Sequence, residues 1–576
     1  MTRAEMTALG WTDLDVLIVT GDAYVDHPAF GAALIGRWLA AHGYRVGLVA
    51  QPRWDDPSDV ARLGRPRLFA GVTAGALDSL LAHYTAFRKK RRDDPYSPGG
   101  RAGLRPNRAT LVYANLVRQA FPGLPILLGG IEASLRRLTH YDFWSDGPRR
   151  SILLDGKADL VVYGMAELAV LAAAERLKEA RPKPGVPEPG FWAGISGTAF
   201  AGRETDIPSG AVVVILPSHE DISADPAKLV TATLALERHV HEGSHWAVQP
   251  SGNRLVILPP PARPLTQAEM DRLYALPFAR GPHPSYREPI PAARMMAGSI
   301  TTHRGCGGGC TFCSLALHQG RRITSRSRAS IVQEVAALAG RNDFDGSLSD
   351  VGGPSANMWG AVCTRTDGRC RRTSCLYPAL CPRLRVDQTA ILGLLEALQD
   401  LPGVKHVRVA SGVRFDLALK DLEYLNGLAA DFVGGQLKIA PEHVSPGVLK
   451  LMRKPGREIF EEFLKRFEAA SRRAGRRQYV VPYLISAFPG CTEKEMKELA
   501  DWLEARNWRP RQVQCFIPTP GTLATAMYFA GVDTQGRPIP VARTDAVRLR
   551  QHGLLAPQTA KTKKRDRSGR RADRKD

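Results

Sequence analysis

Residues 298–313 read Gly-Ser-Ile-Thr-Thr-His-Arg-Gly-Cys-Gly-Gly-Gly-Cys-Thr-Phe-Cys and carry three thiols, Cys306, Cys310 and Cys313. The run 298–303 predicts a β-strand, and the glycines after it predict a loop that can turn its backbone amides toward sulfur atoms. Three thiolates on such a loop can hold a 4Fe-4S cluster, and the fourth iron then stays open for another ligand. We therefore predict an iron–sulfur centre with a substrate position at this loop.

A structural zinc site is the alternative for the same three cysteines, with His303 or His318 as the fourth ligand. Structural zinc loops usually carry paired CxxC motifs. The spacings of four and three residues therefore favour the cluster over zinc.

The chain around this loop predicts a partial (β/α)6 barrel. Most of the predicted strands are followed by a helical pattern, for example at 330–339 and 492–505. In barrels of this kind the chemistry lies on loops after the carboxyl ends of the strands. The six predicted strands lie at 298–303, 347–351, 406–410, 434–440, 478–486 and 512–516.

The first half of the chain predicts an open parallel sheet of the Rossmann-like α/β type. Short apolar runs alternate with helical patterns at 30–42 and 166–177. Ligands of such sheets bind beyond the carboxyl ends of the strands. The predicted strands lie at 15–20, 44–50, 125–130 and 158–164.

The predicted domains are an N-terminal α/β domain, a barrel and a C-terminal extension, over residues 1–290, 291–530 and 531–576. Proline-rich linker segments lie near 181–190 and 259–264 within the first domain. The end of the chain from Lys561 is basic and poor in apolar residues, which predicts a disordered tail.

The CxxxCxxC loop after a first barrel strand resembles the motif of the radical SAM superfamily, and its flanks resemble the YgiQ-like family within it. The resemblance covers roughly residues 10–530, although Gly307 stands where that family commonly has an aromatic residue. The motifs that carry it are Asp94-Pro-Tyr-Ser-Pro-Gly-Gly100, Leu276-Pro-Phe278, His283-Pro-Ser-Tyr286, His318-Gln-Gly-Arg321, Asp350-Val-Gly-Gly-Pro354, Ala410-Ser-Gly-Val-Arg414 and Lys438-Ile-Ala-Pro-Glu-His443.

The resemblance implies that Cys306, Cys310 and Cys313 ligate a 4Fe-4S cluster whose open iron binds S-adenosylmethionine. An electron from a donor of the flavodoxin or ferredoxin type would then cleave this cofactor to a 5'-deoxyadenosyl radical. The resemblance further implies cofactor-binding roles for Gly352 and Gly353 at the methionine amino group, for the Phe312 backbone at adenine and for Glu442 at the ribose, with Ser411, Arg414 and the turn 487–490 as weaker candidates.

A second cysteine group follows the second predicted barrel strand. Seven of the nine cysteines lie between Cys306 and Cys381, and the second group is Cys363, Cys370, Cys375 and Cys381. Four thiolates can complete the ligand shell of a structural zinc ion or of a second iron–sulfur cluster. The spacings match no common zinc ribbon, and a set of redox-reactive or merely tolerated thiols is the other alternative.

Radical SAM barrels that follow an open parallel sheet often bind cobalamin in that sheet. The sequence has Asp26-His27-Pro-Ala-Phe-Gly31 where a DxHxxG motif would be sought, so the motif is broken. This argues against cobalamin, and we expect the N-terminal domain to have a substrate or scaffold role.

The chain has 576 residues and a net charge of +22, of which its last 16 residues contribute +6. The remaining charge and the run Arg88-Lys-Lys-Arg-Arg92 would suit a polyanionic substrate such as RNA. The sequence has no apolar run long enough to span a bilayer and no secretory signal, so we expect a cytoplasmic protein without membrane contact.

The sequence thus predicts a radical SAM enzyme that cleaves S-adenosylmethionine reductively and acts on an unknown substrate through unknown catalytic residues. Methyl or methylthio transfer to RNA or protein is the first alternative. A non-catalytic iron–sulfur or zinc protein that binds nucleic acid is the second. Gly352-Gly353 after a barrel strand disfavours the second alternative, because a metal-binding module needs no site for a cofactor amino group.

Overall fold

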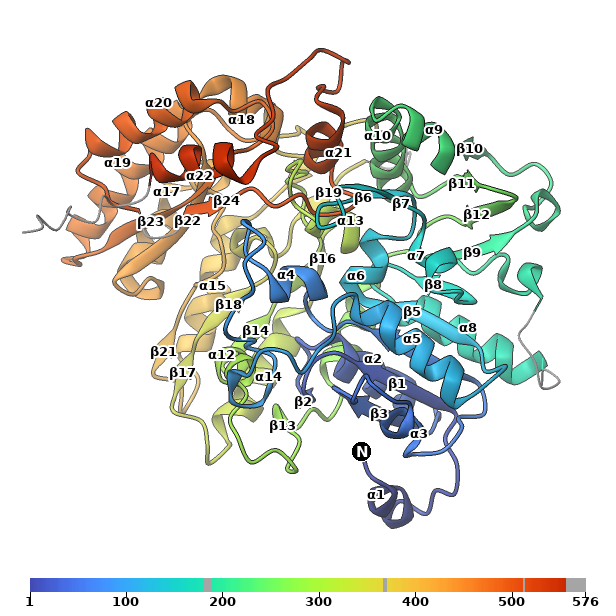
Figure 1. Ribbon diagram of the computed structural model, residues 1–576. Coiled ribbons are helices and arrows are strands. Elements are labelled where there is room, and N and C mark those ends of the chain that lie inside the picture. The colour runs from blue at the N-terminus through green and yellow to red at the C-terminus, as the bar shows by residue number, and fades with distance from the viewer. Residues whose placement is uncertain (181–187, 366–369, 511–512, 556–576) are drawn as a thin grey trace, which may run out of the picture.

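The protein is described by a computed structural model that covers residues 1–180, 188–365, 370–510 and 513–555 (Figure 1). The N-terminal half forms one large mixed sheet with helices on both faces, and the C-terminal half forms a curved set of parallel strands backed by helices. The α/β fold class predicted from the sequence is confirmed. No helix in the described ranges is long and apolar enough to cross a bilayer.

The N-terminal sheet has nine strands in the order β10-β11-β12-β9-β8-β5-β4-β1-β3. Strands β3, β1, β4, β5 and β8 are parallel, which matches the predicted sheet, whereas β9 pairs antiparallel with both β8 and β12 and extends the sheet. The bounds are β1 (Val16–Thr20), β3 (Val46–Ala50), β4 (Phe69–Thr73), β5 (Ile126–Gly129), β8 (Leu160–Val162), β9 (Thr198–Gly202), β10 (Val213–Ile215), β11 (Trp246–Ser251) and β12 (Arg254–Leu258).

Apolar helix faces cover both sides of this sheet. On α5, Tyr113, Leu116 and Val117 are buried at helical spacing against one face. On the other face, α2 buries Leu34 and Trp38. The covering helices are α5 (Ala109–Ala120) and α7 (Ile152–Asp155) on the first face, and α2 (Gly31–Ala41), α8 (Glu167–Ala180) and α11 (Gln267–Tyr274) on the second.

The barrel strands match the six predicted segments in order. Strand β14 pairs in parallel with β18, β17 with β21, and β22, β23 and β24 form a three-stranded parallel sheet. Their bounds are β14 (Ser299–Thr301), β17 (Ser347–Leu348), β18 (Asp350–Gly352), β21 (His406–Val407), β22 (Gln436–Glu442), β23 (Tyr479–Ser486) and β24 (Val513–Cys515). Helices α14 (Arg328–Ala339), α15 (Gln388–Gln399), α19 (Arg457–Arg473) and α20 (Glu493–Glu504) follow them.

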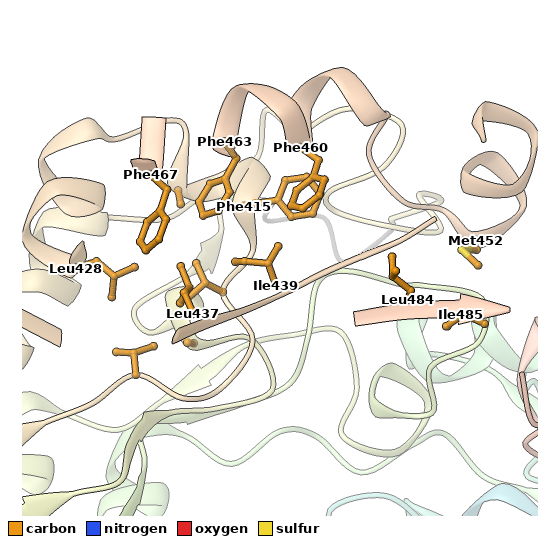
Figure 2. Close-up of a cluster of buried hydrophobic side chains, with 14 of the residues drawn as sticks. Phe415, Leu428, Leu437, Ile439, Met452, Phe460, Phe463, Phe467, Leu484 and Ile485 are labelled. Atoms are coloured by element: carbon orange, nitrogen blue, oxygen red, sulfur yellow. The ribbon is translucent and has the colours of Figure 1, made fainter. Parts of the chain in front are cut away.

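Helix α19 shows how the barrel core forms. Its Phe460, Phe463 and Phe467 recur at spacings of three and four residues and are almost fully buried. Figure 2 shows these rings on one side of the helix, above Leu437 and Ile439 of β22. Burying an aromatic or branched side chain of this kind contributes about 1.5–3 kcal/mol, so this face fixes the helix on the strands.

The C-terminal segment packs on both halves of the protein. Helix α21 (Leu523–Ala530) contacts α10 (Ala227–Glu242) of the N-terminal half, and α22 (Asp545–Gly553) packs on β24 and α20. The side chain of Arg548 in α22 donates to the Phe516 carbonyl at 2.5 Å. The predicted disordered tail from Lys561 and residues 181–187 of the predicted linker lie outside the described residues.

Candidate active site between the sheet and the barrel

A cavity of about 710 Å³ lies between the two halves of the protein. Its N-terminal wall consists of residues at the carboxyl ends of the parallel strands, including Thr20, Thr73 and Gly129. Its other wall consists of barrel residues, including His303 and Gly353. In both halves, the edge at which α/β folds bind ligands therefore faces this cavity.

The cysteine loop begins directly after β14 and is fixed by its backbone. Gly305 has a φ of +86°, and a Cβ there would lie 2.1 Å from the Arg322 carbonyl oxygen, so only glycine fits. The Cys306 amide donates to the Gly320 carbonyl at 3.1 Å. Thr311 donates through its hydroxyl to the Leu451 carbonyl at 2.8 Å, which ties the loop to α18 (Pro446–Met452).

Two of the three thiols, Cys306 and Cys310, lie beside Gly308. A Cβ on Gly308 would lie 3.4 Å from Cys306 Sγ and 3.8 Å from Cys310 Sγ, so the missing side chain leaves a space between the sulfurs. Burial, and then the neighbouring Cys310 and Cys306, raise the pKa of the Cys313 thiol to about 12. Three thiolates can coexist here only with positive charge among them, which iron ions supply. The residues present therefore fit a 4Fe-4S cluster.

A single-ion zinc site is not formed by these residues. Among the residues that the structure describes, no three His, Cys, Asp or Glu side chains lie close enough together to hold one metal ion. His303 and His318, the predicted fourth ligands, both line the cavity. Burial lowers the pKa of each imidazole to about 4, so both rings are neutral at pH 7.

The predicted glycines Gly352 and Gly353 end β18 and line the cavity beside the cysteine loop. A Cβ on Gly353 would lie 2.7 Å from His303 Cε1, so this position has no room for a side chain. Asp350, at the start of the same strand, accepts hydrogen bonds from the amides of Ala410 and Ser411 at 2.9 Å and from the Ser411 hydroxyl. Asp350 thus holds the predicted residue Ser411 against the cavity.

Glu442, predicted at the ribose, ends β22 in the left-handed region with a φ of +70°. Its carboxylate is buried and lies 3.8 Å from Lys454 Nζ. Burial is the main cause of the raised pKa of Glu442. Phe312, predicted at the adenine, packs edge-on against Phe488 with a centroid distance of 6.2 Å. Gly352, Gly353 and Ser411 are thus at the cavity wall, whereas Glu442 and Phe312 are not among its described lining residues.

Arg414, a weaker candidate, lies beside Gly308 and the thiols of Cys306 and Cys310. Its Nη1 is 4.0 Å from Cys310 Sγ, and its Nη2 is 2.6 Å from the Asp416 carboxylate. The cation therefore faces the thiols while its charge is balanced by Asp416. The turn 487–490 belongs to the C-terminal packing, because Gly490 donates to the Pro540 carbonyl at 2.8 Å.

The broken motif at Asp26 and His27 has a structural role in this fold. Asp26 forms an ion pair with Arg37 at 2.5 Å and accepts from the Ala279 amide at 2.8 Å. His27 Nδ1 accepts from the Ala29 amide at 3.1 Å, and burial lowers the pKa of His27 to about 3. His27 is not among the described residues that line the cavity, so this imidazole is not placed to bind a ligand there.

The second cysteine group packs on the first. The Cys375 amide donates a hydrogen bond to the Gly307 carbonyl at 2.8 Å, and the Cys381 amide donates one to the Cys375 carbonyl at 2.7 Å. Cys370 is half-buried, whereas Cys363 is exposed on the short strand β19 (Val362–Cys363). The sequence predicted this group after the second barrel strand, but its direct contact with the glycines 307–309 is evident only from the structure.

Residue Glu167 is part of the site, as the sequence predicts for a residue just beyond the carboxyl end of the strand 158–164. It begins α8, lines the cavity and binds Arg304, two residues before Cys306. The sequence signal for Glu167 is that it follows a predicted strand of the N-terminal sheet, because such sheets bind ligands at the carboxyl ends of their strands.

Two protein families match this chain, one after the other along the sequence. Residues 1–299 match the family described as Radical SAM N-terminal, and residues 300–503 match the Radical SAM superfamily. A UPF0313 protein of Geobacter sulfurreducens is 49% identical over 560 residues, which cover 96% of this chain and 91% of that protein. A UPF0313 protein of Thermotoga neapolitana is 46% identical over 556 residues, covering 95% of this chain and 96% of that protein.

Among solved structures, the chain is similar in fold to TsrM from Kitasatospora setae. That radical S-adenosylmethionine methyltransferase, solved with cobalamin and a 4Fe-4S cluster bound, has 15% sequence identity and a TM-score of 0.52, over 89% of this chain and 77% of its own. At this identity the similarity concerns the fold alone.

The prediction that cobalamin is disfavoured is wrong. It relied on a local histidine motif, whereas a chain with the same fold binds cobalamin together with its cluster, and the N-terminal family match covers the corresponding domain. What the motif could not reveal is the open cavity at the strand ends of the sheet, which depends on tertiary packing. The protein belongs to the radical SAM superfamily, with UPF0313 proteins as its relatives.

Proposed function

We propose that this protein is a radical SAM methyltransferase that holds S-adenosylmethionine at the cysteine loop and cobalamin in the cavity of about 710 Å³. The observation that carries the proposal is that one cavity contacts both the strand ends of the N-terminal sheet and the residues Gly352, Gly353 and Ser411 of the barrel. The similarity in fold to TsrM, a methyltransferase with both cofactors, supports it.

The chain supplies binding and orientation at this site. Cys306, Cys310 and Cys313 would hold the cluster, and Gly352 with Gly353 would present bare backbone to S-adenosylmethionine. When bound, the cluster and the two cofactors supply one-electron and methyl-group chemistry. Asp350 fixes Ser411 at the cavity wall, and the half-buried position of the three cysteines limits the access of bulk water to their sulfurs.

The N-terminal wall of the cavity suits a large ligand because its strand ends carry small residues. Gly31, Ala32, Gly75 and Ala76 line the cavity, and Gly31 and Ala76 are exposed at its mouth. Cobalamin would bind here without a histidine ligand from the broken motif, because His27 is not among the described residues that line the cavity.

A tryptophan in the cavity wall tests the cobalamin part of the proposal. Ala32 and Ala40 lie on the same helix, but only Ala32 lines the cavity and Ala40 is exposed. We expect Ala32→Trp to lower the cobalamin retained after gel filtration at least tenfold, read from its visible absorption, while Ala40→Trp retains the wild-type amount. Absence of cobalamin binding by the wild-type protein, or equal retention by both variants, would overturn this part.

Cleavage of S-adenosylmethionine tests the cluster part separately. With reconstituted iron and sulfide and dithionite as reductant, the wild type should consume S-adenosylmethionine. Ala at Cys306, Cys310 or Cys313 should abolish this consumption, whereas Cys515→Ala, at a buried cysteine of β24, should leave it unchanged. Undiminished consumption by any of the first three variants contradicts the assignment.

RNA is the acceptor favoured by a specific surface feature. The basic run 88–92 is exposed on a turn that follows α4 (Ser79–His83), and Leu77 and Leu81 near that helix line the cavity. A polyanion held by these side chains would therefore lie next to the cavity mouth. The electron donor expected for such an enzyme is a flavodoxin or ferredoxin type of protein.

A further inference from the structure

The loop 370–381 has no role in the chemistry described above, yet it covers the glycine tract of the cluster loop. The Ser374 hydroxyl donates to the Gly308 carbonyl at 2.5 Å. A Cβ on Gly309 would lie 2.4 Å from the Thr373 carbonyl oxygen, and one on Gly307 would lie 3.2 Å from Cys375 Cβ. Gly309 is thus needed because Thr373 packs directly on it, and Gly307 lies close against Cys375.

Three of the four cysteines of the second group belong to this covering loop. Cys375 is half-buried and Cys381 is buried, and the two are joined by the backbone hydrogen bond of 2.7 Å between the Cys381 amide and the Cys375 carbonyl. Cys370 is half-buried as well. Cys363 differs from these three because its side chain is exposed.

The charges around these thiols favour an anionic centre. Residues 370–381 read Cys-Arg-Arg-Thr-Ser-Cys-Leu-Tyr-Pro-Ala-Leu-Cys and contain no carboxylate. Arg321 Nη2 lies 3.5 Å from Cys375 Sγ and donates to it. Arg372 donates to the carbonyls of Ser374 at 3.0 Å and Ala379 at 2.6 Å, which folds the loop around the thiols. Such cationic groups lower the energy of thiolates and of the clusters that thiolates bind.

We propose that Cys370, Cys375 and Cys381 hold a second iron–sulfur cluster, packed directly behind the glycine tract of the first. A cluster fits better than zinc, because the spacings of these cysteines match no common zinc ribbon and the cationic surroundings suit an anionic cluster. The two centres would share the backbone contacts of residues 307–309, so the second stands where electrons can reach the first.

Metal analysis in a chain without the first cluster tests this inference independently of the proposed methyl transfer. The background variant is Cys306→Ala/Cys310→Ala/Cys313→Ala, reconstituted anaerobically with iron and sulfide and freed of loose metal. We expect it to retain about four irons per chain, the content of one 4Fe-4S cluster. Adding Cys375→Ala or Cys375→Ser should reduce the iron to background. Adding Cys363→Ala, the matched change at the exposed cysteine, should leave it unchanged.

The wild-type chain provides a second measurement that does not depend on the triple variant. It should hold about eight irons, and Cys375→Ser alone about four, with a thermal unfolding transition that shows the variant is folded. Iron retained without Cys375, iron lost with Cys363→Ala, zinc in place of iron, or neither metal in the triple variant would each overturn the assignment.

Discussion

Arg304 and Glu167 form a buried ion pair between the barrel and the N-terminal sheet, with Arg304 Nη1 2.5 Å from Glu167 Oε1. Arg304 lies two residues before Cys306, and Glu167 begins α8, the helix that follows strand β8 of the sheet. The guanidinium also lies over the Tyr274 ring at 5.5 Å. The pair fixes the start of the cluster loop relative to the cavity wall, so the two halves act as one site.

Removing one member of this pair should strongly destabilise the protein. Glu167→Gln leaves the buried Arg304 charge without compensation, which costs about 3–5 kcal/mol in comparable pairs. We expect a loss of this size in the free energy of urea unfolding.

The control for that loss is an exposed pair. Glu468→Ala removes the partner of Arg472 on α19, where both side chains are about 70% exposed, and should cost less than about 0.5 kcal/mol. The double variant Arg304→Met/Glu167→Met should be more stable than Glu167→Gln, because no charge then stays buried. Equal losses for Glu167→Gln and Glu468→Ala would contradict a structural role of the buried pair.

Asp350 should control the affinity for S-adenosylmethionine. Its carboxylate accepts hydrogen bonds from two backbone amides and the Ser411 hydroxyl, and hydrogen bonds to charged groups contribute about 1.5–3 kcal/mol each. Asp350→Ala should therefore weaken anaerobic binding of S-adenosylmethionine roughly tenfold to a hundredfold. Ser411→Ala, which keeps both amide contacts, should have a smaller effect, and an equal effect of the two changes would disprove the role of Asp350.

Asp22 gives a prediction for the pH dependence of stability. Burial is the main cause that raises the pKa of Asp22 from 3.8 to about 6, against the opposing charge of Arg105 at 3.0 Å. The folded state then binds this proton more tightly than the unfolded state. The contribution of Asp22 to stability therefore falls as the pH rises from about 4 to about 6, by up to about 1.4 kcal/mol per pH unit, and is constant above that range.

Asp22→Asn should remove this slope, which is measured as the difference between wild-type and variant unfolding free energies across pH 4 to 7. Arg105 keeps Asp94 as a partner at 2.9 Å in the variant. Asp159→Asn is a second case, because burial also raises the pKa of Asp159 to about 6. A difference that does not change with pH in either variant would contradict the assigned shifts.

The basic run 88–92 should contribute to RNA binding if RNA is the acceptor. Replacing Lys89, Lys90 and Arg92 with Ala should weaken binding of single-stranded RNA and lower the slope of log Kd against log salt by roughly 2, about 0.7 for each phosphate that is no longer neutralised. The measurement uses a chain ending at Pro557, so that the basic tail does not contribute. Replacing the exposed Lys465, Lys494 and Lys497 of α19 and α20 is the control, and equal effects of the two triple variants would exclude a specific surface.

Local sequence was sufficient for the elements and for the cluster loop. The six barrel strands appear where the pattern predicts them, and two helices begin at capping boxes that are visible in the sequence, Thr266 with Glu269 and Thr492 with Glu495. Strand alternation, capping and the spacing of Cys306, Cys310 and Cys313 act over a few residues, so they can be read along the chain.

Contacts between distant residues could not be read in this way. Glu167 meets Arg304 across 137 residues, and Cys375 packs on Gly307 although 68 positions separate them in the sequence. The cavity depends on how the strand ends of the sheet face those of the barrel, and for this reason a missing histidine motif wrongly argued against cobalamin. The order of residues along the chain was enough to predict which thiols bind iron. Packing between the two halves sets what lies beside those thiols, because buried charge and shape complementarity are properties of the assembled core.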